Sequence, residues 1–223
     1  MKDLRRIKAV VFDLDGTLLN TLLDIGAGAN MALHRSGLPE HTMAEYRRLV
    51  GHGIRNLFRL AVPENTPESV YDEALSYYLS YYPEHCTDHT DYFPGIQQML
   101  NALHENGYRL GILSNKTEAT SRKIIAQFFP DVPFALVWGN NGTRPLKPQT
   151  DAGYALCEAL SLRADEIAYV GDGDTDMEFA SKMGFFALGV TWGYRDRDEL
   201  IAAGADVLAD TAEQITETLC ASK

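Results

Sequence analysis

Short runs of apolar and β-branched residues recur along the chain and predict buried strands. Their apolar character is continuous rather than alternating, which is typical of strands that are covered on both faces in a parallel sheet. The runs are IKAVVF (7–12), YRLGILS (108–114), ALVWG (135–139), EIAYVG (166–171) and FFALGV (185–190).

Stretches with helical periodicity separate most of these runs. The stretch GIQQMLNALHENG (95–107) places its apolar residues on one helical face, and Gly107 is typical of a helix end. Strands that alternate with amphipathic helices predict an α/β fold with a doubly wound, Rossmann-like parallel sheet. This alternation holds from about residue 91 onward, and residues 7–13 fit it as well.

The segment between the first strand and residue 91 has helical patterns and no convincing strand. It predicts a small α-helical cap domain inserted into the core, in which the tyrosine-rich stretch 71–82 is expected to pack the helices rather than line a pocket. Pro94 and Gly95 mark the turn into the next core helix. The predicted division is a core domain of residues 1–19 and 91–223 and a cap domain of residues 20–90.

The charge balance limits the kinds of partner. The chain has 31 acidic and 20 basic residues and a formal net charge of -11, which disfavours nucleic acid and anionic membranes as partners. An anionic substrate would need local attraction by a metal ion or a few placed cations. The three cysteines form no CxxC pair, and the first apolar run is far shorter than a signal peptide or membrane span requires. A soluble, cytoplasmic protein is therefore expected.

Polar residues with chemical potential follow several of the predicted strands. In an open parallel sheet, ligands bind at the carboxyl ends of the strands. Four segments are therefore expected to meet at one edge of the sheet. They are residues 13–17 after the first strand, 114–116 after the second, 147–148 before a later helix, and 171–176 after the fourth.

Two carboxylates at the end of the first strand indicate acid, base or nucleophilic chemistry. Asp13 and Asp15 stand two positions apart, so one can act as nucleophile and the other as acid or base. The Gly16-Thr17 turn offers amides and a hydroxyl that suit phosphate oxygens. Ser114 can donate another hydrogen bond, and Lys147 supplies a compact positive charge.

The acidic stretch GDGDTD (171–176) has two possible interpretations, a calcium loop and half of a magnesium site. A calcium loop of the EF-hand type needs glycine at its sixth position and glutamate at its twelfth. Counted from Asp172, these positions are Met177 and Met183, which excludes that loop. Asp172 together with Asp13 and a backbone carbonyl would suit Mg²⁺. Such an ion would offset the repulsion of about 4 kcal/mol between two like charges ~4 Å apart.

Four motifs, DLDGTL, LSNK, LKP and GDGDTD, stand in this order and span nearly the whole chain. Together they resemble the pattern of the haloacid dehalogenase (HAD) superfamily of phosphatases. The stretch GVTWGY (189–194) and the helical insertion resemble its phosphoglycolate phosphatase branch.

The resemblance implies roles for the strand-end residues. Asp13 would form an aspartyl-phosphate, and Asp15 would be the acid for the leaving group and then the base for water. Lys147 would neutralise charge between Asp13 and the phosphoryl group. The Mg²⁺ ligands would be Asp13, the backbone carbonyl of Asp15, and Asp172, while Asp176 would orient Lys147 or a metal-bound water.

The resemblance also bears on phosphate binding and on the reaction. Thr17, Ser114 and Asn115 would bind the transferring phosphoryl group. Asp15 favours phosphoryl transfer, because the dehalogenase and phosphonatase branches lack an aspartate there. Ile25 stands where sugar-phosphate mutases of similar architecture carry a histidine, which argues against mutase activity.

One turn in the predicted cap is a candidate for substrate recognition. Gly51, His52 and Gly53 are followed by Arg55, and a glycine-flanked turn that opens a helix offers free amide donors. These four residues are hypothesised to contact the part of the substrate that is not phosphate. An ordinary helix start is the alternative. Asp174 has no role in the family pattern and is expected to favour the start of the next helix.

The sequence thus predicts a Mg²⁺-dependent phosphomonoester hydrolase that acts on a small phosphorylated metabolite, with 2-phosphoglycolate favoured. Pyrophosphate, sugar phosphates and nucleoside monophosphates remain open as substrates. A non-catalytic sensor of a phosphorylated ligand is the alternative from another class. Both a monomer and a homodimer are compatible with the sequence.

Overall fold

The computed structural model describes residues 2–221. Its core is a six-stranded sheet, and every neighbouring pair of strands is parallel. This confirms the predicted α/β fold. In spatial order the strands are β5 (Phe134–Asn140), β4 (Arg109–Thr117), β1 (Ala9–Phe12), β6 (Ile167–Gly171), β7 (Phe186–Val190) and β8 (Val207–Ala209).

The first strand of the chain lies in the middle of the sheet. Val10 of β1 pairs with Leu110 on one side and with Ala168 on the other. Every residue of β1, β6 and β7 is buried, which explains their uninterrupted apolar sequences. The backbone amide of Asp13 then donates to the carbonyl of Val170 at 2.9 Å. This pairing brings the residues after β1 and β6 together at one edge.

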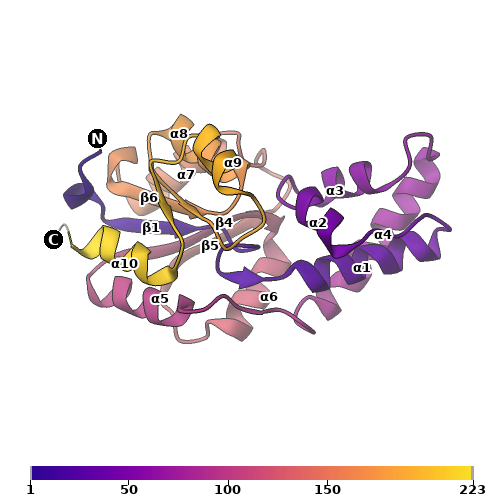
Figure 1. Cartoon of the computed structure of the whole chain (residues 1–223), viewed down its shortest axis with the longest axis horizontal. Coiled ribbons are helices and arrows are strands. Elements are labelled where there is room, and N and C mark those ends of the chain that lie inside the picture. Colours follow the sequence, from indigo (N-terminus) through magenta and orange to yellow (C-terminus); the bar gives the residue numbers. More distant parts are fainter. Residues whose placement is uncertain (1, 222–223) are drawn as a thin grey trace.

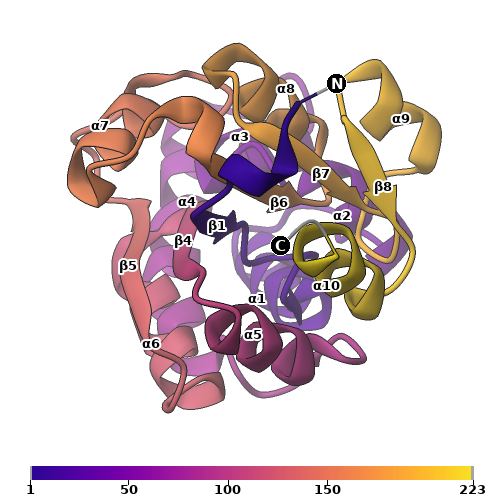
Figure 2. The same ribbon diagram turned by 90° about the vertical axis from the view of Figure 1, so that its left-hand side faces the viewer.

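Helices cover both faces of the sheet (Figure 2). Two apolar clusters divide the core helices between these faces, as expected for a doubly wound sheet. The predicted helix at 95–107 is confirmed by α5. On one face lie α5 (Ile96–Glu105), α6 (Glu118–Phe128) and α10 (Ala212–Cys220), and on the other lie α7 (Asp151–Leu160), α8 (Asp174–Met183) and α9 (Arg197–Ala202).

A block of helices forms a cap beside the core (Figure 1). The chain enters and leaves it through two short antiparallel strands, β2 (Leu19–Asn20) and β3 (Asp91–Tyr92). Nothing in the sequence predicted these strands, because two residues are too few to show an alternating pattern. The cap helices are α1 (Leu22–Arg35), α2 (Met43–Leu49), α3 (Ile54–Ala61) and α4 (Glu68–His85).

A buried carboxylate holds the two cap connections together. Asp24 in the first turn of α1 is 2% exposed and accepts hydrogen bonds from the backbone amides of His89 and Thr90. The hydroxyl of Thr90 donates to the same carboxylate at 2.7 Å. The outgoing and returning chain segments are therefore joined next to the β2–β3 pair. Within residues 2–221, no helix has both the length and the apolar character needed to span a membrane.

Candidate active site

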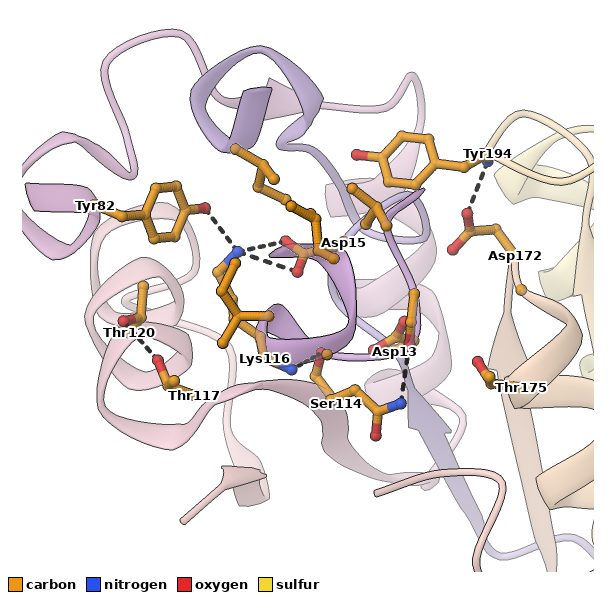
Figure 3. Close-up of a pocket in the computed structure, with 18 of the residues that line it drawn as sticks. Asp13, Asp15, Tyr82, Ser114, Lys116, Thr117, Thr120, Asp172, Thr175 and Tyr194 are labelled. Carbon is orange, nitrogen blue, oxygen red and sulfur yellow. Dashed lines mark hydrogen bonds and ion pairs between the residues drawn. The ribbon is translucent and has the colours of Figure 1, made fainter. Parts of the chain in front are cut away.

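A cavity of about 260 Å³ lies where the core meets the cap. Its core side is formed at the ends of β1, β4 and β6, and its cap side by α1, α3 and α4. Figure 3 shows this cavity with Asp13, Asp15, Ser114 and Asp172 around it. The predicted site residues that line it are Asp13, Asp15, Gly51, Gly53, Ser114, Asn115, Asp172 and Asp176.

Lys147 lies buried between two of the predicted carboxylates. Its ammonium group is 3.1 Å from Oδ1 of Asp13 and 2.7 Å from Oδ1 of Asp176. It also donates to the hydroxyl of Tyr169 and to the carbonyl of Leu113. Burial opposes the charge of Lys147, but the two carboxylates outweigh it and raise its pKa well above the ordinary value. The ammonium group therefore stays charged beside Asp13.

Asp172 is packed tightly against the turn that follows β1. Its carboxylate accepts from the hydroxyl of Thr17 and from the backbone amide of Tyr194, each at 2.8 Å. A Cβ at Gly16 or at Gly193 would come within 2.2 Å of the Asp172 side chain, so only glycine fits at both positions. Thr17 does not line the cavity. Its hydroxyl orients Asp172. The sequence predicted that Thr17 contacts the phosphoryl group, and its place outside the cavity lining does not support that contact.

The buried carboxylates repel one another. Burial, which outweighs the nearby Lys147 ammonium, raises the pKa of Asp13 to about 6. Burial together with Asp176 and Asp13 raises the pKa of Asp172 to about 8. Oδ1 of Asp13 is buried and, among the described residues, accepts no well-aligned hydrogen bond. One more positive charge would relieve this cluster, so its residues fit a divalent cation.

Three carboxylates come close enough to share a metal ion, namely Asp13, Asp172 and Asp176. Asp176 is already neutralised by Lys147 and also accepts from the amide of Gly173 at 2.9 Å. Asp172 accepts only from neutral donors and forms no ion pair with any cation in residues 2–221. We therefore assign Asp13 and Asp172 as the side chains suited to bind the ion, with Asp176 as a support for Lys147.

Asp15 is bound by a lysine that the sequence did not single out. Nζ of Lys116 lies 2.8 and 3.0 Å from the two Asp15 oxygens and donates to the hydroxyl of Tyr82 at 2.7 Å (Figure 3). Thr21 donates to Asp15 at 2.6 Å. Lys116 stands in the LSNK motif, two positions after Ser114. This spacing in the sequence could have identified it as a residue of the site. Tyr82 also lines the cavity, so the tyrosine-rich stretch both packs the cap and lines the pocket.

The side chain of Asn115 is used to position backbone. Its Nδ2 donates to the carbonyls of Gly51 and Lys147, and its Oδ1 accepts from the amide of Lys147. The side chain therefore holds the Lys147 segment and the cap turn against β4, which differs from the predicted contact with phosphate. Ser114 keeps its predicted place, because it lines the cavity and its side chain acts to lower the pKa of Asp13.

Only part of the predicted cap turn reaches the cavity. Gly51 and Gly53 line it, whereas His52 and Arg55 do not. His52 instead lies 3.4 Å from Asp174, the first residue of α8. Its hydrogen bond is the main cause that lowers the pKa of Asp174 to about 2. Arg55 is exposed on α3, so the structure does not support it as a substrate ligand.

Two arginines exchange hydrogen bonds between the core and the cap. Arg195, directly after the GVTWGY stretch, donates to the carbonyls of Arg47, Arg48 and Val50 at the carboxyl end of α2. Arg47 donates in return to the carbonyls of Gly193 and Tyr194. A cation at a helix carboxyl end satisfies unpaired carbonyls and favours the helix dipole. The cap is thereby fastened to the loop that holds Asp172.

Removing the Lys116 side chain is expected to destabilise the fold. In Lys116→Met, the Asp15 carboxylate, whose side chain is 13% exposed, keeps no cation within the described residues. The free energy of unfolding should fall by about 3 kcal/mol. Urea unfolding measures this, and adding Asp15→Asn should restore most of the loss. Lys123→Met on the exposed part of α6 is the matched control and should change stability by less than about 0.5 kcal/mol. Equal effects of both lysine substitutions would contradict the proposed pairing.

A parallel sheet with these carboxylates and a buried lysine beneath a helical cap is an arrangement suited to phosphoryl transfer. The chain belongs to the haloacid dehalogenase-like hydrolase family, because the model of that family matches residues 10–190. This confirms the resemblance found in the four motifs.

Similar proteins and structures cover almost the whole chain. A phosphoglycolate phosphatase of Chromobacterium violaceum is 28% identical over 221 residues, which is 97% of this chain and 98% of that protein. A phosphoglycolate phosphatase of Cereibacter sphaeroides is 34% identical over 190 residues, or 83% and 86% of the two chains. The crystal structure of a predicted phosphoglycolate phosphatase from Haemophilus somnus superposes with a TM-score of 0.89 at 26% identity, covering 98% and 99%.

Proposed function

We propose that the enzyme hydrolyses phosphate monoesters through an aspartyl-phosphate formed on Asp13. The observation that carries this proposal is the position of Asp13. Its carboxylate faces the cavity at the end of β1, with the charged Lys147 3.1 Å from Oδ1 and an oxygen of Asp172 within 4.8 Å. A nucleophilic carboxylate needs such a neighbouring cation, since it must approach an anionic phosphate.

The reaction has two steps that balance. An oxygen of Asp13 bonds to phosphorus while the bond from phosphorus to the ester oxygen breaks, and Asp15 gives its proton to the departing alcohol. Water then attacks phosphorus and loses a proton to Asp15, so that phosphate and free Asp13 are released. The Asp15 carboxylate lines the same cavity and is oriented by Thr21 and Lys116, which supports its role as the base for water.

The remaining residues stabilise charge and geometry. Lys147 offsets the negative charge between Asp13 and the phosphoryl oxygens, and Asp176 fixes the position of its ammonium group. Ser114 is placed to donate to a phosphoryl oxygen. A divalent cation such as Mg²⁺, held by Asp13, Asp172 and the backbone carbonyl of Asp15, would supply the further positive charge that phosphoryl transfer needs.

The cap supplies the rest of the enclosure. The Arg195 and Arg47 hydrogen bonds fasten α2 to the core, and the cap turn at Gly51 closes against Asn115. Exclusion of bulk water strengthens the electrostatic interactions inside the cavity. A phospholigand sensor would need no acid such as Asp15, so the intact set favours an enzyme. The relatives are named phosphoglycolate phosphatases, so 2-phosphoglycolate is one candidate substrate by resemblance.

The proposal predicts release of inorganic phosphate from para-nitrophenyl phosphate and from a panel of phosphometabolites in the presence of Mg²⁺. The values of kcat/KM across the panel, which should include 2-phosphoglycolate, pyrophosphate, sugar phosphates and nucleoside monophosphates, define the substrate. A protein that binds these compounds but releases phosphate from none of them would be a sensor, and the proposed function would be wrong.

A further inference from the structure

The cavity has two ends of different chemistry. The core end carries the carboxylates and the hydroxyl of Ser114, as Figure 3 shows. The cap end is built almost wholly from hydrocarbon and aromatic side chains. Those that line it are Ile25 of α1, Ile54 and Leu57 of α3, and Tyr78 and Leu79 of α4. A phosphate bound beside Asp13 would direct the organic part of its ester toward this apolar wall.

The cavity has no cation free to pair with a second anionic group. Among the described residues that line it, the positively charged ones are Lys116 and Arg195. Lys116 is held by both oxygens of Asp15. Arg195 is 8% exposed. Its guanidinium donates to the cap carbonyls of Arg47 and Val50 and lies 3.4 Å from the Asp174 carboxylate. Arg195 could bind a substrate carboxylate only by leaving buried groups without their partner, which is costly. Lys116 could bind one only when Asp15 is protonated, and capture of a carboxylate by Lys116 is therefore a competing outcome of the test.

This lining favours one kind of organic group over another. Each methylene that leaves water for an apolar site strengthens binding by about fourfold. A carboxylate that leaves water without a cation or a full set of donors pays a large desolvation cost. With a volume of about 260 Å³, the cavity approaches the range of about 300–1,000 Å³ that is typical of sites for small organic ligands.

One feature of the cap wall could offset part of this cost. The amides at the start of α3, next to Gly53 and Ile54, have no side-chain cap, and both residues line the cavity. A helix amino end carries about half a unit of positive charge. That is less than a carboxylate needs, and the neighbouring Ile54 and Leu57 side chains are apolar. Capture of a carboxylate by these amides is a second competing outcome of the test.

We propose that the enzyme prefers phosphate monoesters whose organic group is apolar and uncharged, such as alkyl or aryl phosphates, over esters with a carboxylate such as 2-phosphoglycolate. This rests on the proposed function, because it names the substrate class of the same site. Ile54, Leu57 and Leu79 are the side chains that set the preference.

Two non-hydrolysable phosphonates of equal length test the preference directly. Propylphosphonate ends in a methyl group where 3-phosphonopropionate ends in a carboxylate. Titration calorimetry of the whole enzyme with Mg²⁺ should show that propylphosphonate binds at least about tenfold more tightly than 3-phosphonopropionate. Butylphosphonate, which has one more methylene, should bind about fourfold more tightly than propylphosphonate. Equal or tighter binding of 3-phosphonopropionate would overturn the inference and favour capture by the amides of α3 or by Lys116.

The same preference should appear in turnover. The value of kcat/KM should rise from methyl to butyl phosphate and exceed that for 2-phosphoglycolate. Turnover with 2-phosphoglycolate as the best substrate would overturn this inference and leave the proposed function intact. Absence of turnover with every ester would overturn the proposed function itself.

A cation added at the cap end should reverse the selectivity. Leu79 lines the cavity and is 40% exposed, so Leu79→Lys can place an ammonium group there without disturbing the buried core. The ratio of the two phosphonate affinities should shift at least about tenfold toward 3-phosphonopropionate, because the new ammonium group would pair with the buried carboxylate of that ligand. Leu60→Lys is the matched control, because Leu60 is 56% exposed on α3 and does not line the cavity. Equal shifts in both variants would count against the assignment of Leu79.

Discussion

Asp13→Asn is expected to lower kcat for phosphate release by at least about 10⁴-fold. The amide has the size of the carboxylate but cannot form an aspartyl-phosphate, and it removes the partner of Lys147 at 3.1 Å. Phosphate release at saturating substrate and Mg²⁺ measures the effect. Asp198→Asn, an exposed acid on α9, is the matched control and should retain full activity. Unchanged turnover in Asp13→Asn would exclude Asp13 as the nucleophile.

The same substitution should leave the fold intact. Burial raises the pKa of Asp13 to about 6, so its ionised form costs stability at neutral pH in the metal-free protein. A neutral amide takes one charge out of the cluster with Asp172 and Asp176. The melting temperature of metal-free Asp13→Asn is therefore expected to match or exceed that of the parent, so a loss of activity would report on chemistry rather than on folding.

Asp172→Asn is expected to lower kcat/KM by about 10³-fold, or about 4 kcal/mol, and to remove the dependence of activity on Mg²⁺. Asp172 is 3% exposed and is held by Thr17 and Tyr194, so the isosteric amide can keep both contacts in part. What it loses is the charge that would hold the ion next to Asp13. Chelation of the metal from the parent protein should reduce activity to a similar level.

The pH dependence of the stability of Asp172→Asn, relative to the parent protein, is a second test of the role of Asp172. Burial, together with Asp176 and Asp13, raises the pKa of Asp172 from an ordinary value of 3.8 to about 8 in the folded protein, so the folded state binds its proton more tightly. This contribution to stability is present below pH about 4 and is lost as pH rises toward about 8. Without metal, the amide variant should therefore gain stability relative to the parent as pH rises. Mg²⁺ should raise the melting temperature of the parent alone, and an equal rise in the variant would contradict the assigned metal ligand.

The parts of the fold that could be predicted are those whose environment is uniform along the element. β1, β6 and β7 are buried over their whole length, so an unbroken apolar run is enough to identify them. β8 was missed because it has three residues, two of them only half-buried. The connection through β2 and β3 depends on pairing between distant segments, and such pairing leaves no local pattern.

Some residues of the candidate site could also be predicted from the sequence, and others could not. Residues at strand ends were predicted, because the topology of a parallel sheet brings Asp13, Ser114 and Asp172 to one edge. Contacts across the core–cap interface were not predicted, because they depend on how α2 and α3 lie against the core. Arg195 donates to the cap carbonyl of Val50, and Lys116 reaches the hydroxyl of Tyr82 on the cap helix α4. For the same reason His52 pairs with Asp174 instead of facing a substrate, although its sequence context suggested a ligand.

Asp13 is the residue that we expect to become phosphorylated. Borohydride reduces an acyl phosphate to an alcohol, so quenching the enzyme during steady-state turnover should convert Asp13 to homoserine. Peptide mass spectrometry of the quenched protein locates that change. We expect homoserine at position 13 only when substrate and Mg²⁺ are both present, and none in Asp13→Asn. Reduction at another carboxylate, or none at position 13 during active turnover, would contradict the claim.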